Sequence, residues 1–217
     1  ELRSDCEENS DGIFISSVAY TELAATASDA VNALDELYGV QLFDLAARTR
    51  PKAMYFSEIM SYIQLTGVIF PYISEPNINV HQPAYGIPST MCHELSHICG
   101  FMREDEANFI SYLACYHSGN IELQYSGAMM GLIHATNRLY RYDPNAWQEI
   151  CSLLPEGVLR DISANSHYWK KYETPVGEAA DRWNDAYLKA NAQTDGVQSY
   201  GRMVDLLIAF YRSQNAL

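Results

Sequence analysis

The chain has 217 residues, of which 48% are hydrophobic and 19% charged, a composition that indicates a globular protein with a real core and excludes a disordered chain. Its 14 Lys and Arg residues stand against 27 Asp and Glu residues, which gives a formal net charge of −13. A surface this acidic repels phosphate groups, so we expect neither nucleic-acid binding nor adhesion to an anionic membrane through a basic patch.

No stretch has the composition of a linker, so we predict a single domain over residues 1–217, with a polar and frayed segment at 1–12. The chain starts at Glu1 without a Met, and we expect a preceding targeting segment to have been removed. The most apolar runs, 65–73 and 128–135, are shorter than the roughly 20 residues that span a bilayer. The five cysteines are scattered, which predicts small buried side chains rather than a disulfide framework or a zinc–thiolate cluster.

The N-terminal half begins with a helical pattern and continues with β-prone pieces. Apolar residues at three- and four-residue spacings predict a helix over 17–37 that stops at Gly39, followed by a short helix over 42–48. Residues 52–80 contain β-prone pieces at 53–56 and 67–73, interrupted by Gly67, Pro71 and Pro76, and predict a small sheet or hairpin. Residues 81–88 are rich in Pro and Gly and predict a loop.

From residue 89 to the C-terminus the pattern is helical. Helix starts are marked by Pro144 just after Asp143, by Pro155 and by Pro175. The predicted helices cover 89–99, 104–117, 121–140, 144–153, 156–171, 176–191 and 198–213. The sequence therefore predicts a mainly α protein of the α+β class, with a small β element directly before the helix at 89–99.

That helix carries the segment His93-Glu94-Leu95-Ser96-His97. Two histidines four positions apart project from one face of a helix, roughly 40° apart, and can bind one Zn²⁺ together. Glu94 lies about 100° further round, where it can act as general base on a metal-activated water. The apolar residues of the helix fall on the opposite face, which favours a buried side and a histidine side directed into a cleft.

A catalytic zinc takes three protein ligands and keeps one position open. One family of zinc peptidases continues as His-Glu-x-x-His-x-x-Gly-x-x-His, but here Gly100 is followed by Arg103, which cannot ligate. The segment Glu104-x-x-Ala107-Asn108 resembles the Glu-x-x-Ala-Asp/Asn signature of gluzincins, whose third ligand is a glutamate on the next helix. This resemblance implies Glu104 as the third ligand and Asn108 as a residue that hydrogen-bonds a ligating imidazole.

Glu104 follows His97 by only seven positions, which is short for gluzincins and requires a sharp turn between the two helices. Helical projection favours Glu104 because it shares a polar face with Asn108. Asp105 and Glu106 stay open as alternative third ligands.

Three longer segments resemble an uncharacterised bacterial family that has two membrane helices at the N-terminus, followed by a soluble domain with this motif. The segments are PKAMYFSEIMSYIQLTGVIFPYISEPNIN, HELSHICGFMREDEANFISYLAC and NDAYLKANAQTDGVQSYGRMVDLL. The resemblance implies a zincin-like fold and an extracytoplasmic domain at a bacterial membrane, held there by an N-terminal anchor. It supplies no substrate.

We therefore predict a zinc-dependent hydrolase, a peptidase with Zn²⁺ as cofactor and a peptide or protein as substrate. The alternative is a membrane-tethered zinc-binding sensor or binding module with little or no peptidase activity. A zincin lays its substrate along an edge strand, for which residues 73–80 are the candidate. An oxyanion donor is also required. Of the candidates we choose Tyr200 as the catalytic residue, because the segment SYGR lies in a matched region; the full set is His134, His167, Tyr168, Tyr200 and Arg202.

Overall fold

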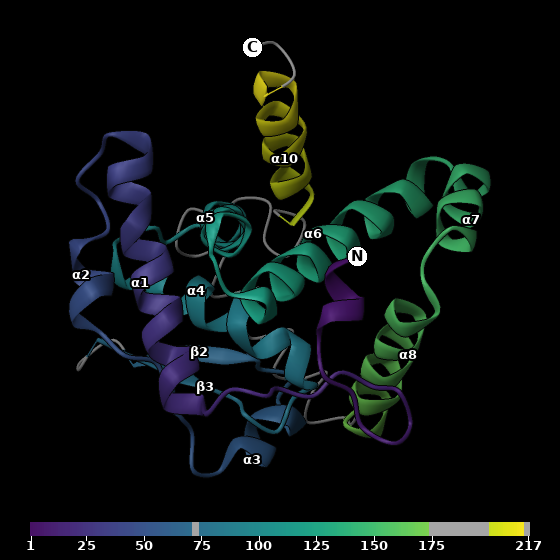
Figure 1. Cartoon of the computed structure of the whole chain (residues 1–217), viewed down its shortest axis with the longest axis horizontal. Coiled ribbons are helices and arrows are strands. Elements are labelled where there is room, and N and C mark those ends of the chain that lie inside the picture. The colour runs from purple at the N-terminus through teal and green to yellow at the C-terminus, as the bar shows by residue number, and fades with distance from the viewer. Residues whose placement is uncertain (71–73, 174–199, 215–217) are drawn as a thin grey trace.

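The computed structural model of the chain describes residues 1–70, 74–173 and 200–214. These residues are mainly helical and include one small sheet, which confirms the predicted fold class (Figure 1). The α-helices are α1 (Tyr20–Tyr38), α2 (Asp44–Arg48), α3 (Ser57–Tyr62), α4 (Ile87–Ile98), α5 (Glu104–His117), α6 (Ile121–Tyr142), α7 (Pro144–Ser152), α8 (Glu156–Lys171) and α10 (Tyr200–Gln214). The remaining elements are the 3₁₀ helices η1 (Leu2–Asp5) and η2 (Ala84–Gly86) and the strands β1 (Lys52–Ala53), β2 (Gly67–Phe70) and β3 (Glu75–Ile78).

The helix ends follow the signals in the sequence. Helix α1 stops at Gly39, which adopts φ 66° and donates its N–H to the Asp35 carbonyl. The side chains of Asn120 and Asp143 accept backbone N–H groups at the starts of α6 and α7. The helix predicted over 176–191 lies outside the described residues. Within the described ranges, none of the helices is long and apolar enough to cross a membrane.

The section between α2 and α4 differs from the prediction in detail. The sheet has the order β1-β3-β2, with β1 parallel and β2 antiparallel to β3. The expected strand at 53–56 is only two residues long, and α3 follows it instead, with Met60 buried. The expected loop at 81–88 contains η2 and the first residues of α4. Periodicity could not separate a strand from a helix in such short apolar runs.

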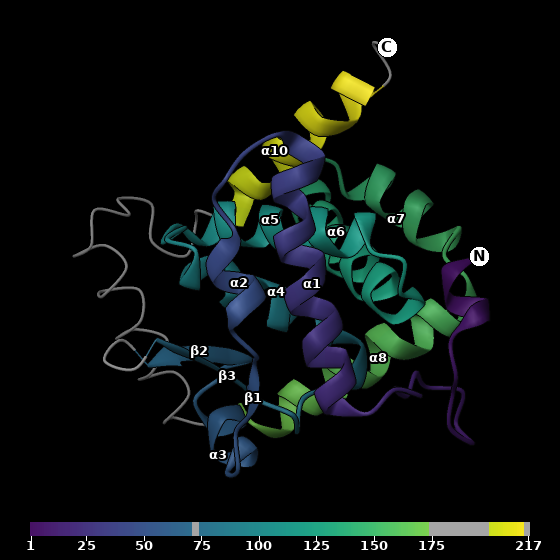
Figure 2. The same cartoon turned by 60° about the vertical axis from the view of Figure 1, so that its left-hand side comes forward.

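Helix α4 lies at the centre of the fold. It packs against α1, α5 and α6 on the helical side and against β2 and β3 on the other side (Figures 1 and 2). Met91, Cys92 and Leu95 are fully buried in the main core, with Val31 of α1 and Leu123 of α6. This burial fixes the rotation of α4 about its axis, and therefore the direction in which its polar residues point.

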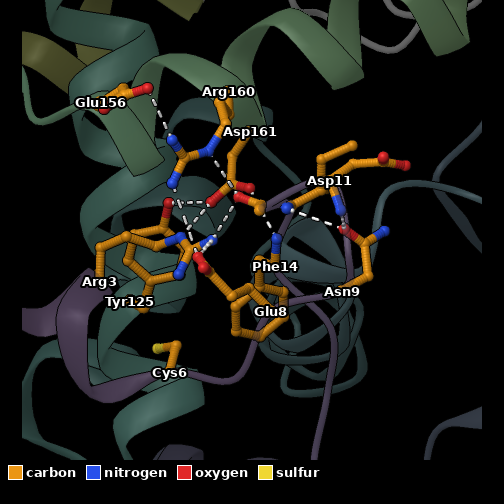
Figure 3. A network of polar contacts seen from close by, with 12 residues as sticks. Arg3, Cys6, Glu8, Asn9, Asp11, Phe14, Tyr125, Glu156, Arg160 and Asp161 are labelled. Carbon is orange, nitrogen blue, oxygen red and sulfur yellow. Dashed lines mark hydrogen bonds and ion pairs between the residues drawn. The ribbon is translucent and has the colours of Figure 1, made fainter.

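The N-terminal segment is attached rather than frayed. Arg3 is buried, and its Nε donates to Asp161 Oδ2 of α8 at 2.7 Å (Figure 3). The same carboxylate accepts the Phe14 backbone N–H at 2.8 Å and the Tyr125 hydroxyl of α6 at 2.5 Å. The polar composition of 1–12 predicted solvent exposure, because a sequence does not show that a buried carboxylate 158 positions away pairs with Arg3.

Candidate metal centre

The two histidines of α4 lie on the side opposite its buried apolar face. Their Nε2 atoms are 3.0 Å apart, and their rings are nearly perpendicular, with an interplanar angle of 87°. Each side chain keeps some contact with solvent, 15% for His93 and 13% for His97. The spacing of four positions therefore brings both imidazoles to one point that solvent reaches.

A tight turn brings Glu104 to the same point. Gly100 follows α4 with φ +96° and donates its N–H to the His97 carbonyl at 2.9 Å, a conformation that favours glycine. Helix α5 then begins at Glu104, whose Oε2 lies 3.4 Å from His93 Nε2 and whose Oε1 lies 3.7 Å from His97 Nε2. The short sequence spacing is thus accommodated by one left-handed residue.

The three distances among the histidine Nε2 atoms and the Glu104 oxygens fit a tetrahedrally coordinated cation. With zinc–nitrogen and zinc–oxygen bonds of about 2.0–2.1 Å and tetrahedral angles, two ligand atoms of one ion lie about 3.3 Å apart. The observed separations of 3.0, 3.4 and 3.7 Å bracket that value. In the described part of the chain, His93, His97 and Glu104 form the group of side chains whose ligand atoms converge in this way.

The hydrogen bonds around the cluster orient one imidazole for ligation. His97 Nδ1 donates to the Phe101 carbonyl at 2.6 Å, which leaves Nε2 as the lone-pair atom that faces Glu104. Asn108 was predicted to hold a ligating imidazole in the same way. It lines the cavity together with His93 and makes the smallest of the contributions that raise the pKa of His93, but among the described residues no group lies within hydrogen-bonding geometry of His93 Nδ1. The predicted role of Asn108 therefore stays a prediction.

The two alternative acidic ligands point elsewhere. Asp105 is buried and pairs with Arg103 at 2.8 Å, and Glu106 is 44% exposed and lies 3.5 Å from the same guanidinium. Of the three neighbouring acidic residues, Glu104 is the one whose carboxylate meets both histidines.

The charges in the cluster are coupled. Burial alone would lower the pKa of His93, but contacts with the Glu104 carboxylate outweigh it and raise that pKa. Burial alone would raise the pKa of the Glu104 carboxyl, but its contacts with His93 lower that pKa. Burial and the neighbouring His93 lower the pKa of His97 to about 4, so this imidazole is neutral at pH 7. A cation at the cluster would compete with a proton for the His93 imidazole.

Glu94 lies beside this cluster without joining it. Its side chain is almost fully buried, and burial, with a smaller contribution from Glu104, raises the pKa of its carboxyl to about 7. It packs against β2 at Gly67, where an added Cβ would lie 2.8 Å from the Cδ and Cγ atoms of Glu94. The sequence analysis missed this role of Gly67. A glycine inside a β-prone run was the available signal, because it often marks a close approach.

A cavity of about 270 Å³ adjoins the cluster and is lined by residues of α4, α5, α6 and α8. Of the predicted oxyanion donors, His134 of α6 lies in its wall, as do His93 and Glu104. Burial, with a smaller effect of His93, lowers the pKa of His134 to about 4. The sequence pattern alone did not distinguish His134 from the other candidates.

None of the other predicted donors belongs to the described cavity wall. Tyr168 is tied to the region of α3, where its hydroxyl hydrogen-bonds Ser61 Oγ at 2.5 Å. His167 and Arg202 are exposed on α8 and α10. Tyr200 begins α10, and its side chain lies outside the described part of the structure.

The expected substrate strand at 73–80 is corrected by the sheet. Strand β3 lies between β1 and β2, so both of its edges are already paired. Strand β2 is an outer strand of the described sheet. Thr66 O accepts the Asn79 N–H at 2.9 Å, and the antiparallel alternation therefore turns the N–H and C=O groups of Gly67 and Ile69 away from β3. The unpaired sheet edge that lies next to Glu94 therefore belongs to β2 and not to the expected strand at 73–80.

The described residues thus define a helical α+β domain with a His₂–carboxylate cluster able to hold a metal ion. The chain belongs to the family described as "Protein of unknown function (DUF3810)", which matches residues 1–208. This confirms the expectation of an uncharacterised family. No curated protein and no solved structure matches the chain.

Proposed function

We propose that the protein is a zinc-dependent hydrolase that acts on peptide bonds. The observation that carries the proposal is the convergence of His93, His97 and Glu104 at 3.0–3.7 Å, with a second carboxylate, Glu94, beside them and outside the ligand set. Two histidines and a glutamate suit Zn²⁺, and three protein ligands leave a coordination position for substrate or water. When bound, the ion supplies Lewis-acid polarisation of the substrate carbonyl and lowers the pKa of water.

The residues of the chain supply the proton transfers. Glu94 accepts a proton from the attacking water and donates it to the leaving amine, a task for which a carboxyl pKa of about 7 is suited. His134, neutral and in the cavity wall, is the described residue best situated to donate a hydrogen bond to the developing oxyanion. Tyr200 is retained as the donor predicted from the sequence.

The substrate is proposed to be an extended peptide that pairs with β2. The outward backbone groups of Gly67 and Ile69 offer two donors and two acceptors to such a strand. Because Gly67 contacts Glu94, a peptide bond paired near Gly67 would lie beside the general base.

Metal content tests the proposal first. Protein purified without chelators is expected to hold one zinc per chain by elemental analysis, and His93→Ala is expected to lose it. The matched control is His167→Ala, which changes an exposed histidine of α8 and should keep the metal. Substoichiometric zinc in the unaltered protein, or unchanged zinc in His93→Ala, would refute the proposal.

Glu94→Gln separates the hydrolase from the alternative binding module. For a hydrolase, this variant keeps zinc and loses about 10²–10⁴-fold in cleavage of a mixed fluorogenic peptide pool, the range for a lost general acid–base group. A binding module would hold zinc and cleave nothing before or after the substitution.

We also propose an extracytoplasmic, membrane-anchored location, which rests on the resemblance to a family with N-terminal membrane helices. Digestion of intact and lysed spheroplasts by an added protease would test this location. The proposal requires that the domain is cleaved in intact spheroplasts.

A further inference from the structure

The cavity beside the metal cluster is placed to receive a side chain of a bound peptide. His93 and Glu104 form part of its wall, and their side chains are 15% and 20% exposed. Thr66, the residue before the outer strand β2, belongs to the same wall. A peptide that pairs with β2 therefore passes the mouth of the cavity, and one of its side chains is the group that can enter.

Three polar side chains in the wall already donate hydrogen bonds to the backbone. Ser89 Oγ and Thr90 Oγ1 donate to the Gly86 carbonyl at 3.1 and 2.9 Å. Gln82 Nε2 donates to the Thr66 carbonyl at 3.2 Å. A polar side chain that entered the cavity would lose its hydration and could not use these three donors without breaking their backbone bonds, which is unfavourable.

The wall also lacks a counter-charge. Glu104 is the one carboxylate among the described lining residues, and the proposed function assigns it to the metal. These lining residues include no Lys or Arg. His134 is neutral at pH 7, since burial lowers its pKa to about 4. A charged side chain would therefore find no counter-charge in the wall other than the metal cluster itself.

Apolar surface is what the wall presents to an occupant. Met130 and Ile133 of α6 and Trp169 of α8 all line the cavity. The indole Nε1 donates to Asn165 Oδ1 at 3.2 Å, so the polar atom of Trp169 is satisfied and its ring can pack. Asn165 and Trp169 follow Asp161 at four-residue steps, so the buried Asp161 holds the face of α8 that carries them.

We propose that this cavity is a substrate subsite for one large uncharged side chain, with a phenyl-sized ring as its preferred occupant, and that Trp169 determines the preference. The inference rests on the proposed function. An apolar cavity of about 150 Å³ is enough to bind benzene. The present cavity of about 270 Å³ has room for a ring and the methylenes that join it to a backbone.

Hydroxamates test the subsite without requiring turnover. Acetohydroxamate carries the zinc-binding group alone, 3-phenylpropanohydroxamate adds a ring, and succinic monohydroxamate adds a carboxylate. Each is titrated calorimetrically into the zinc-loaded 217-residue protein. The phenyl probe is expected to bind about 10- to 100-fold more tightly than acetohydroxamate, which is the gain for burying a side chain of that size. The carboxylate probe is expected to show no gain.

Three variants test whether the cavity wall, and Trp169 in particular, determines the preference for the phenyl probe. Trp169→Ala removes a wall and Ile133→Trp fills the cavity, and both should abolish the phenyl advantage while acetohydroxamate binding and zinc content stay unchanged. Trp147→Ala, on α7 and outside the cavity wall, should keep the advantage. Equal affinity for the phenyl and carboxylate probes, or an advantage that survives in both cavity variants, overturns the subsite. Failure to take up zinc overturns the proposed function itself.

Discussion

Arg3→Ala is expected to destabilise the protein strongly, because Arg3 is the cation that pairs with the buried carboxylate of Asp161. The Arg3 and Asp161 side chains are 8% and 0% exposed, and Nε lies 2.7 Å from Oδ2. Water therefore cannot take over the role of the guanidinium. Removing one partner of such a pair costs about 3–5 kcal/mol, since the remaining charge stays buried without compensation.

The magnitude should fall near the lower end of that range. Asp161 keeps two donors in the variant, the Phe14 N–H at 2.8 Å and the Tyr125 hydroxyl at 2.5 Å (Figure 3). We therefore expect a loss of about 3 kcal/mol in the free energy of unfolding. Asp161→Asn added to Arg3→Ala should recover part of this loss, because the neutral amide removes the unpaired charge.

Urea unfolding followed by tryptophan fluorescence measures the effect. The control is Arg48→Ala, whose side chain is 75% exposed and pairs with the exposed Asp44 of α2 at 3.0 Å. Exposed pairs contribute about 0–1 kcal/mol, so this variant should stay close to the unaltered protein. If Arg3→Ala is as stable as Arg48→Ala, the network does not hold the N-terminal segment as argued.

Three other predictions concern the metal site. Gly67→Ala should leave the zinc content unchanged and lower peptide cleavage about 10²-fold, because the new Cβ displaces Glu94; Gly119→Ala, where an added Cβ meets nothing within 4 Å, is the control for both measurements. Asn108→Ala should weaken zinc binding about 10-fold in a competitive chelator titration if Asn108 supports a ligating imidazole, and an unchanged affinity would remove it from that role. Zinc at 100 times its dissociation constant adds about 2.7 kcal/mol of stability, so chelation should lower Tm by about 5–10 °C in a thermal scan, and His93→Ala should abolish that shift.

The features that the sequence predicted well are local ones. The predicted helix over 104–117 coincides with α5, because its apolar periodicity and its start are both encoded within the segment. The two histidines follow from helical spacing alone, and their position opposite the buried Met91 and Leu95 agrees with the predicted projection. The assignment of Glu104 as third ligand also needed the Glu-x-x-Ala-Asn signature, since spacing alone did not exclude Asp105.

The features that sequence analysis missed depend on long-range contacts. The pairing of Arg3 with Asp161 joins residues 158 positions apart, and no local pattern encodes it. The contact of Gly67 with Glu94 likewise requires the sheet to lie against α4. Trp169 could not be connected with the metal site, because α8 follows the motif by many residues and reaches the cavity only in the folded chain.

The metal cluster and the part of the cavity wall on α8 are held in place by different parts of the chain, which in the proposed hydrolase would separate catalysis from selectivity. The α4–α5 contact sets the ligand geometry and includes a hydrogen bond from Ser111 Oγ to the Ser89 carbonyl at 2.7 Å. The wall on α8 instead depends on Asp161 and its contact with the N-terminal segment. If the proposed subsite is correct, substitutions on α8 should change which substrate side chain is accepted without moving the metal ligands. By the same argument, Arg3→Ala should weaken the phenyl hydroxamate more than it weakens zinc.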